Sequence, residues 1–197
     1  EDARLLVGRN LAELISEPPP ETAFGKRNYS HSVKDAIAAG LVMDIHRRGN
    51  RNIVILDDDT ARLEVNFFHE NFQEFRHLIK KDEIIVVSGS LRYDDFSSAW
   101  QLNAKSVEIL DNLIEKKVRK LILNLRENKD GDDVFHQLRS ILISEKGKGS
   151  CEVVVKYIGN TAEGHWNLGS EWNISPSREI RDRLTKLSGV NSVKLIY

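Results

Sequence analysis

The stretch from residue 46 to 65, HRRGNRNIVILDDDTARLEV, contains the side chains of this chain that are best suited to metal chemistry. Asp57, Asp58 and Asp59 could hold a divalent ion, because two-metal phosphoryl-transfer sites use clustered carboxylates. Such carboxylates normally project from alternate positions of one strand, whereas these three are consecutive and lie between two strand patterns. Aspartate in that setting is typical of a turn, where its side chain bonds the nearby backbone. The sequence therefore predicts a hairpin turn, and a magnesium-dependent enzyme of phosphodiester chemistry is the less favoured alternative.

Three arginines in the same stretch flank a short polar turn. Arg47, Arg48 and Arg51 surround Gly49 and Asn50 between two strand patterns. Cations on a tight turn can follow a phosphate backbone, and backbone contacts of this kind position a nucleic acid without reading its sequence. The sequence predicts DNA binding by Arg47, Arg48, Asn50 and Arg51. A solvated hairpin tip is the alternative.

A second loop combines aromatic rings with a nearby cation. Tyr93, Phe96 and Trp100 frame the segment DDFSS, and Lys105 follows on the next strand pattern. Bases of single strands stack on such rings, so we expect these four residues to contact DNA. Trp100 could instead plug a barrel, and Phe96 could anchor its loop.

The strand and helix patterns before residue 111 follow a fixed order. Alternating or β-branched apolar residues predict strands over 36–48, 52–56, 61–68, 83–93 and 99–110, and apolar residues at helical spacing predict one helix over 69–81. Three strands, a helix and two strands are the order of the OB-fold, a partly open five-stranded barrel that binds oligonucleotides. We expect an OB-fold over residues 34–110 that binds single-stranded DNA; another kind of small barrel is the alternative.

A second domain is expected over residues 111–197. A helical connector leads into a strand at 120–125, a helix at 132–143, strands at 151–158 and 165–174, and a strand at 192–197. Ser175 and Pro176 predict the start of a further helix, as cap and first residue. The order is β-α-β-β-α-β, so the predicted fold class is α+β with an OB-fold barrel followed by a small ferredoxin-like domain. Residues 1–33, with a short helix and the segment EPPP, are expected to be a linker or remnant of a preceding domain.

Composition limits the remaining possibilities. The chain has 197 residues, about 40% of them hydrophobic and 30% charged, and no apolar run approaches the length of a membrane span. A single cysteine and six scattered histidines predict no disulfide, no metal site and no cofactor, and we expect a cytoplasmic location. Residues 34–110 carry 10 basic and 13 acidic side chains, whereas residues 111–197 carry 15 and 12. Any nucleic-acid binding must therefore come from local clusters of cations.

Several motifs occur together in an order that resembles a known family. GNR, LDD, ARLEV, KKDEIIVVSGSLRYDDFSS, AK before SVEI, and EWNISPS leading to LIY are similar to the C-terminal part of the bacterial replicative DNA polymerase III alpha subunit. The resemblance covers residues 33–197. It implies an OB-fold that contacts single-stranded template and a last domain that docks the tau subunit of the clamp loader.

The resemblance also implies a division of labour within a longer parent chain. The parent would be a DNA-directed DNA polymerase, a nucleotidyltransferase, that meets the other holoenzyme subunits through regions upstream. This part would carry no catalytic residue. For tau we expect contacts at Trp166, Trp172 and the end of the chain, namely Val193, Leu195 and Tyr197, because aromatic and apolar anchors dominate protein interfaces. The alternatives are that the tryptophans only pack on helices, and that the barrel is a protein-interaction module without DNA binding.

Overall fold

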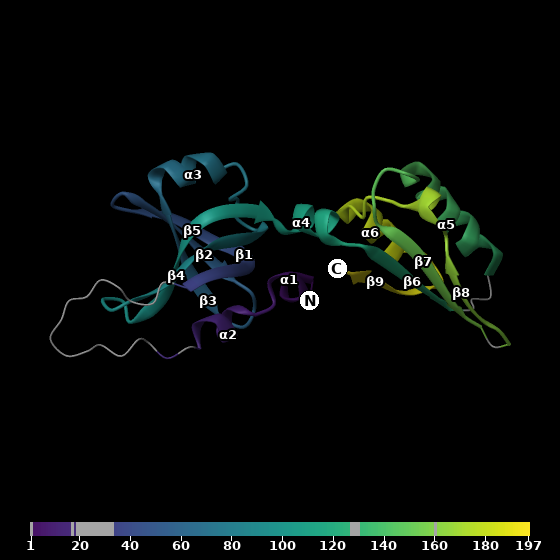
Figure 1. Cartoon of the computed structure of the whole chain (residues 1–197), viewed down its shortest axis with the longest axis horizontal. Coiled ribbons are helices and arrows are strands. Elements are labelled where there is room, and N and C mark those ends of the chain that lie inside the picture. Colours follow the sequence, from purple (N-terminus) through teal and green to yellow (C-terminus); the bar gives the residue numbers. More distant parts are fainter. Residues whose placement is uncertain (1, 17, 19–33, 127–130, 160) are drawn as a thin grey trace. The chain divides into compact units, whose positions relative to one another are not determined.

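The computed structural model describes residues 2–16, 18, 34–126, 131–159 and 161–197, and the chain divides into two compact units, Glu1–Leu110 and Asp111–Tyr197 (Figure 1). The first unit contains α1 (Asp2–Val7), α2 (Leu11–Ile15), β1 (Lys34–Arg48), β2 (Arg51–Asp57), β3 (Arg62–Phe68), α3 (His69–Phe75), β4 (Ile84–Asp94) and β5 (Ala99–Ile109). The second contains β6 (Lys120–Arg126), α5 (Gly131–Glu145), β7 (Glu152–Ile158), β8 (Glu163–Asn167), a 3-10 turn η1 (Ser170–Trp172), α6 (Arg178–Thr185) and β9 (Val190–Ile196); α4 (Leu110–Lys117) begins at the last residue of the first unit.

The five strands of the first unit close into a barrel in the order β1-β2-β3-β5-β4. Closure depends on the length of β1, which pairs with β4 through Lys34–Leu41 and with β2 through Leu41–Arg48. Where β1 passes from one partner to the other, Gly40 lies against β2, and a Cβ there would be 3.0 Å from the carbonyl oxygen of Asp57. All neighbouring strands are antiparallel except β3 and β5. The predicted OB-fold barrel is confirmed.

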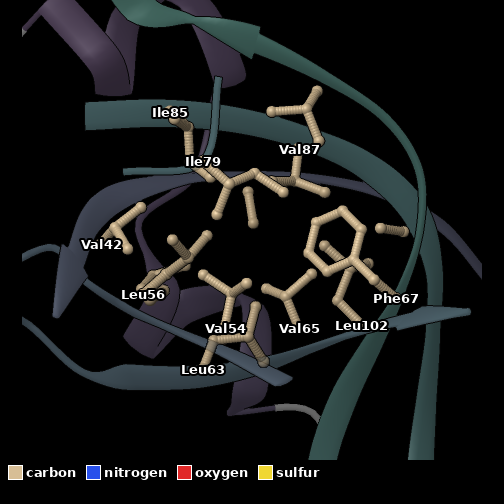
Figure 2. Packing of buried hydrophobic residues seen from close by; sticks show 14 of the residues in the cluster. Val42, Val54, Leu56, Leu63, Val65, Phe67, Ile79, Ile85, Val87 and Leu102 are labelled. Atoms are coloured by element: carbon tan, nitrogen blue, oxygen red, sulfur yellow. The ribbon is translucent and has the colours of Figure 1, made fainter. Parts of the chain in front are cut away.

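The barrel core follows from the alternation of side chains along each strand. Leu63, Val65 and Phe67 of β3 point inward, and Figure 2 shows Phe67 facing residues from the other strands. Ile79, from the segment after α3, and Leu11 of α2 belong to the same buried cluster. Each large side chain that is fully buried contributes about 1.5–3 kcal/mol. The cluster therefore holds the strands and both helices as one unit, with α3 and α2 on opposite sides of the barrel in Figure 1.

The three aspartates form the turn between β2 and β3, as predicted. Asp57 accepts hydrogen bonds from the Asp59 backbone N–H and from Arg62 Nε, each at 2.9 Å. Asp58 Oδ1 accepts from the Thr60 backbone N–H and hydroxyl at 3.0 and 2.6 Å. The hydrogen bond from Arg62, then that from the Asp59 N–H, holds the pKa of Asp57 below its usual range. The Asp57 and Asp58 carboxylates are thus engaged in turn bonds, and Asp59 adopts the positive φ of the turn, 68°.

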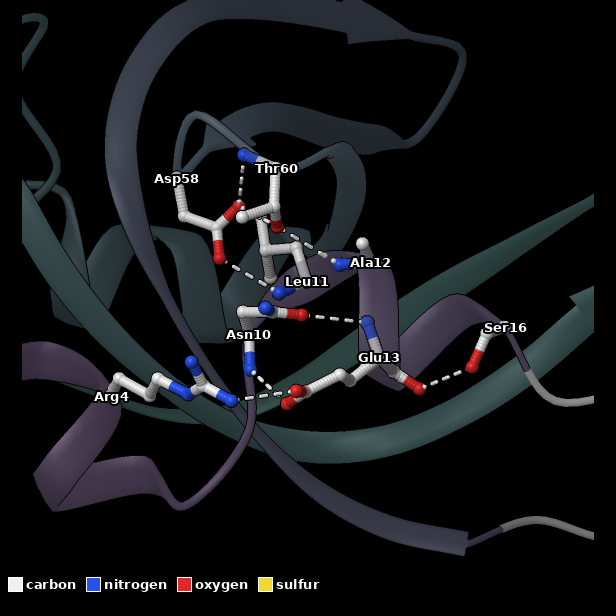
Figure 3. Close-up of polar contacts among 8 residues, drawn as sticks. All are labelled: Arg4, Asn10, Leu11, Ala12, Glu13, Ser16, Asp58 and Thr60. Atoms are coloured by element: carbon white, nitrogen blue, oxygen red, sulfur yellow. Dashed lines mark hydrogen bonds and ion pairs between the residues drawn. The ribbon is translucent and has the colours of Figure 1, made fainter.

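The same turn also caps α2, a contact that the sequence did not predict. The Asp58 Oδ2 atom accepts a hydrogen bond from the Leu11 backbone N–H at 2.8 Å, and Thr60 Oγ1 accepts from the Ala12 N–H at 3.2 Å (Figure 3). Asn10 Oδ1 accepts from the Glu13 N–H, and the Glu13 carboxylate accepts from the Asn10 N–H. Since the first N–H groups of a helix lack partners within it, these contacts satisfy the start of α2. α2 thus packs on the barrel, with Leu11 and Leu14 in its buried cluster.

The second unit is a mixed sheet in the order β8-β7-β6-β9 with α5 and α6 packed together. The β-α-β-β-α-β element order is confirmed. The strand order adds a difference: β6 and β7 are adjacent and parallel, whereas a ferredoxin-like sheet separates these two strands with a third. The βαβ unit here is therefore not split.

The predicted start of the last helix was wrong by two residues. The cap is Ser177, whose hydroxyl accepts from the Ile180 N–H, and α6 begins at Arg178. Ile174 forms a β-bridge with Cys151 and is therefore extended. The chain uses the residues after Ile174 to change direction, so the helix begins later than predicted.

The described residues contain neither a candidate membrane-spanning helix nor a candidate metal site. No helix among them is long and apolar enough to cross a membrane. Within the same residues, no group of three or more His, Cys, Asp or Glu side chains is placed to hold a metal ion.

Candidate nucleic-acid interface

The arginine hairpin is the tight connection between β1 and β2. Arg48 and Arg51 are cross-strand partners, and Gly49 turns the chain with a φ of 62°. Arg47 donates from Nε to the Gly49 carbonyl oxygen at 3.1 Å, which stiffens the turn. The three arginines are exposed. The structure therefore brings together Arg47, Arg48, Asn50 and Arg51, as the sequence predicted.

Phe68 adds an exposed aromatic ring beside these cations. The Arg51 guanidinium lies 5.5 Å from the centre of the Phe68 ring, which is 51% exposed, whereas Phe67 is fully buried. A surface hollow of about 630 Å³ is lined by Arg47, Asn50, Phe68, His69 and Glu70. Phe67 and Phe68 are consecutive on β3, so they point to opposite faces of the strand. Residues two apart share a face of a strand, so Phe67 lies on the same inner face as Leu63 and Val65, and Phe68 lies on the outer face.

A ladder of polar side chains crosses the outer face of β3 and β5. The Asn66 amide donates to Gln101 Oε1 at 2.8 Å, and Gln101 Nε2 donates to Glu64 Oε2 at 3.1 Å. Asn66 is only 3% exposed and lies in register with Ile53 of β2 and Asn103 of β5. The ladder fixes amide groups and one carboxylate on this face. Sequence reasoning missed it, because polar residues at alternate strand positions are typical of any solvated face.

The second predicted loop is the β4–β5 hairpin, which projects from the same side of the barrel as the β1–β2 hairpin in Figure 1. Asp94 Oδ2 accepts from the Ser97 hydroxyl at 2.6 Å and from its backbone N–H at 3.0 Å. The hydroxyl contact is the main cause of a lowered pKa at Asp94, against an opposing effect of burial. Phe96 at the tip is 88% exposed. It therefore anchors nothing in its own loop and is available to a ligand.

Tyr93 and Trp100 lie at the base of this hairpin. They are cross-strand partners with ring centres 5.4 Å apart, edge to face. Trp100 packs against the barrel core, in line with Leu102 of the same strand. This position favours the alternative that Trp100 plugs the barrel.

Lys105 is compensated by a carboxylate. Its Nζ lies 2.6 Å from Asp35 Oδ1, and both side chains are exposed. Lys105 thus differs from the three arginines of the first hairpin, which have no ion pair with a carboxylate in the described part of the chain.

The residues predicted to bind a partner lie in two places of the second unit. Trp166 and Trp172 line one apolar groove of about 430 Å³ between α5 and the β7–β8 side of the sheet. Val193 and Leu195 are half-buried on β9, at the opposite edge of the sheet, and Tyr197 follows them. The structure therefore joins the two tryptophans and separates them from the end of the chain.

Known proteins are similar to this chain over different parts of its length. Residues 37–110 match the family described as OB-fold nucleic acid binding domain. The chain is 34% identical over 165 residues to the DNA polymerase III subunit alpha of Escherichia coli O157:H7, covering 81% of this chain and 14% of that protein. Identity to the same subunit of Haemophilus influenzae is 29% over 195 residues, covering 97% of this chain and 17% of that protein. A crystal structure of asparaginyl-tRNA synthetase from Pyrococcus horikoshii is similar at 17% identity and a TM-score of 0.36, covering 39% of this chain and 20% of that one.

The two kinds of sequence match cover both units, and the chain spans about one seventh of the length of the curated relatives. The barrel alone matches a nucleic-acid-binding family, whereas the polymerase relatives extend over the mixed sheet as well. The chain is therefore homologous to the C-terminal region of DNA polymerase III alpha subunits and contains an OB-fold nucleic acid binding domain.

Proposed function

We propose that this chain is a non-catalytic part of a replicative DNA polymerase that binds single-stranded template through its barrel and the tau subunit of the clamp loader through its second unit. The parent protein would then be a DNA-directed DNA polymerase that meets the other holoenzyme subunits through its remaining length. The observation that carries the DNA half is the Arg51–Phe68 pair beside Arg47 and Arg48, in a domain that matches a nucleic-acid-binding family.

The chemistry of this cluster suits a single strand without sequence preference. The arginines supply phosphate contacts. For a single strand, each lost contact should reduce the slope of the log binding constant against the log salt concentration by about 0.7. An exposed ring such as Phe68 contributes about 1–3 kcal/mol when a base stacks on it. Phe96 at the other hairpin offers a second ring of the same kind.

Fluorescence anisotropy with a labelled oligo(dT) tests the DNA half. The triple variant Arg47→Ala, Arg48→Ala, Arg51→Ala should bind much more weakly and lower the salt slope by about 2, as expected for three lost phosphate contacts. The matched control removes Arg76, Lys80 and Lys81, three exposed cations of the same unit, and should bind nearly as well as the unaltered chain. Equal losses in the two variants would show that only net charge matters.

Phe68→Ala separates stacking from charge. It should weaken binding by about 1–3 kcal/mol while leaving the salt slope unchanged, because no cation is lost. A change in slope without a loss at high salt would contradict a stacking role.

A second candidate for the barrel is a protein-interaction module without DNA binding. It is favoured by the excess of 13 acidic over 10 basic side chains in residues 34–110 and by Glu64 on the outer face. Absence of oligonucleotide binding even at low salt would establish it over the first proposal.

The tau contact rests on the resemblance to the polymerase family and on the apolar groove that contains Trp166 and Trp172. Joining a weak DNA contact and a weak tau contact in one chain raises the effective concentration of each, so neither needs high affinity. Titration calorimetry of the chain with purified tau should show binding, and no heat over a range of temperatures would refute this half.

A further inference from the structure

The apolar groove of the second unit is built mainly by one stripe of α5 and the strands beside it. Phe135, Leu138, Arg139 and Leu142 are spaced at three, four and seven residues, so they share one face of the helix. The remaining wall comes from β7, β8, η1 and the segment between the last two, through Val155, Trp166, Leu168 and Trp172. Of these eight residues, seven are apolar or aromatic and only Arg139 is charged.

Two large apolar side chains that line this groove are exposed. Phe135 is 45% exposed and Trp166 is 49% exposed. Single exposed apolar residues are common, but a contiguous patch with a hollow marks an interaction site. The volume, about 430 Å³, is in the range of pockets that bind ligands.

Both indole rings are held in place before any ligand arrives. The Trp166 ring lies over Gly164 of the same strand, where an added Cβ would be 2.3 Å from the ring, so a larger residue there would displace the ring. The Lys146 ammonium lies 4.9 Å from the centre of the Trp172 ring and 3.3 Å from the Glu171 carboxylate. Fixed rings lower the entropy cost of binding. The groove is thus preorganised.

In and around the groove, one cation lacks a carboxylate partner among the described residues. Lys146 is paired with Glu171, and Lys148 with Glu145 at 3.2 Å. In the part of the chain that the structure describes, Arg139 has neither an ion pair nor a hydrogen bond to a carboxylate. A guanidinium on an apolar wall forms its strongest contact with a carboxylate, which it can bind through two hydrogen bonds.

We propose that this groove binds an apolar segment of a partner protein that carries a carboxylate, with aromatic or aliphatic side chains between Phe135 and Trp166 and the carboxylate on Arg139. The inference deepens the proposed tau contact, because it gives the chemistry of the segment that tau would have to offer. It also stands without tau, since the groove and its unpaired arginine are features of this chain.

A peptide selection tests the chemistry independently of tau. A random peptide library displayed on phage is selected on the whole chain and, in parallel, on the double variant Trp166→Ala, Arg139→Glu. The unaltered chain should enrich sequences that combine large apolar residues with Asp or Glu, and the double variant should not. No enrichment over the double variant, or a consensus without acidic residues, would overturn the proposal.

Purified tau tests the partner, with the intrinsic fluorescence of the groove as the readout. In a Trp100→Phe background, the remaining tryptophans are Trp166 and Trp172, so a change in emission reports occupation of the groove. Trp166→Ala should weaken tau binding by about tenfold, measured by calorimetry, as expected for an aromatic anchor. Arg139→Ala should weaken it by about two- to fivefold, as expected for a partly exposed ion pair.

Matched controls and alternative occupants have distinct outcomes. Ile143→Ala and Arg183→Ala alter exposed residues of α5 and α6 that do not line the groove and should leave tau binding unchanged. Equal binding of tau to all variants would refute the groove as the tau-binding site but keep the proposed function. Tau that fails to bind the unaltered chain would refute the proposed function but leave the peptide selection valid. Dimerisation of the chain that Trp166→Ala abolishes would identify a second copy as the occupant and overturn the proposal.

Discussion

The Asp58 carboxylate joins the β2–β3 turn to α2, so its removal should loosen both. Oδ1 serves the turn, through Thr60 and the Ala61 N–H, and Oδ2 caps the Leu11 N–H. Loss of a helix cap costs about 1 kcal/mol, and loss of the turn bonds costs about another 1 kcal/mol. We therefore expect Asp58→Ala to lower the free energy of unfolding of the first unit by about 2 kcal/mol. Asp58→Asn keeps one oxygen for the turn but presents an NH₂ group to Leu11, so it should cost about half as much.

The pH dependence of this effect has a defined sign. Burial raises the pKa of Asp58, but the hydrogen bonds from Thr60, Leu11 and Ala61 outweigh it and leave the pKa below 3.8. A carboxylate whose folded pKa is lowered stabilises the protein above its unfolded pKa, and this stability is lost as the pH falls through the folded pKa. The difference between Asp58→Asn and the unaltered chain should therefore be full at pH 7 and shrink below about pH 4.

Urea unfolding followed by Trp100 fluorescence measures this prediction, in a background with Trp166→Phe and Trp172→Phe so that only the first unit is reported. Amide hydrogen exchange at Leu11 and Ala12 adds a local readout, which should accelerate in both Asp58 variants. Asp59→Asn is the control, because Asp59 has a φ of 68°, which asparagine tolerates. Unchanged exchange at Leu11 in Asp58→Ala, or an equal loss of stability in Asp59→Asn, would refute the capping role.

Two further predictions concern buried positions. Burial raises the pKa of the Cys151 thiol to about 12, so the folded chain should hold far less thiolate than the unfolded one and react with a disulfide reagent only after denaturation; rapid native labelling at pH 8 would contradict this. Gly89→Ala would place a Cβ 2.1 Å from the Asn103 carbonyl oxygen in the neighbouring strand, so thermal unfolding should show a loss of about 1–3 kcal/mol that Ser90→Ala does not share.

Local patterns predicted most of the fold because each strand shows its inner face in its own sequence. Leu63, Val65 and Phe67 alternate on one seven-residue strand, so their spacing indicates a shared face. Trp100 shares a face with Leu102, but the sequence left open whether its ring contacts DNA or plugs the barrel. The consecutive aspartates predicted a turn for the same local reason.

Contacts between distant segments could not be predicted from these patterns. Asp58 and Leu11 are 47 residues apart, and nothing in the sequence near either residue indicates the other. The pairing of β6 with β7 is similar, since the β-α-β-β-α-β order is compatible with a split or an adjacent pair of parallel strands. The groove is lined by residues of both α5 and β8. Its prediction would have required the order of the strands in the sheet, which local patterns do not give.

Net charge is a poor guide to whether the barrel binds a polyanion, because the positions and partners of the carboxylates decide the local potential. Asp57, Asp58 and Asp94 accept hydrogen bonds within their own turns, and Asp35 neutralises Lys105. The arginine hairpin keeps its cations free of such pairs among the described residues, and screening limits the influence of other charges to about 8–10 Å in physiological salt. A strand that passes over the hairpin and Phe68 would therefore experience these cations more strongly than the overall excess of acid.

The same geometry places Glu64 next to Gln101 on the strand face, where a base edge is better accommodated than a phosphate. A nucleic acid on this barrel should accordingly turn its phosphates toward the hairpin and its bases toward the sheet.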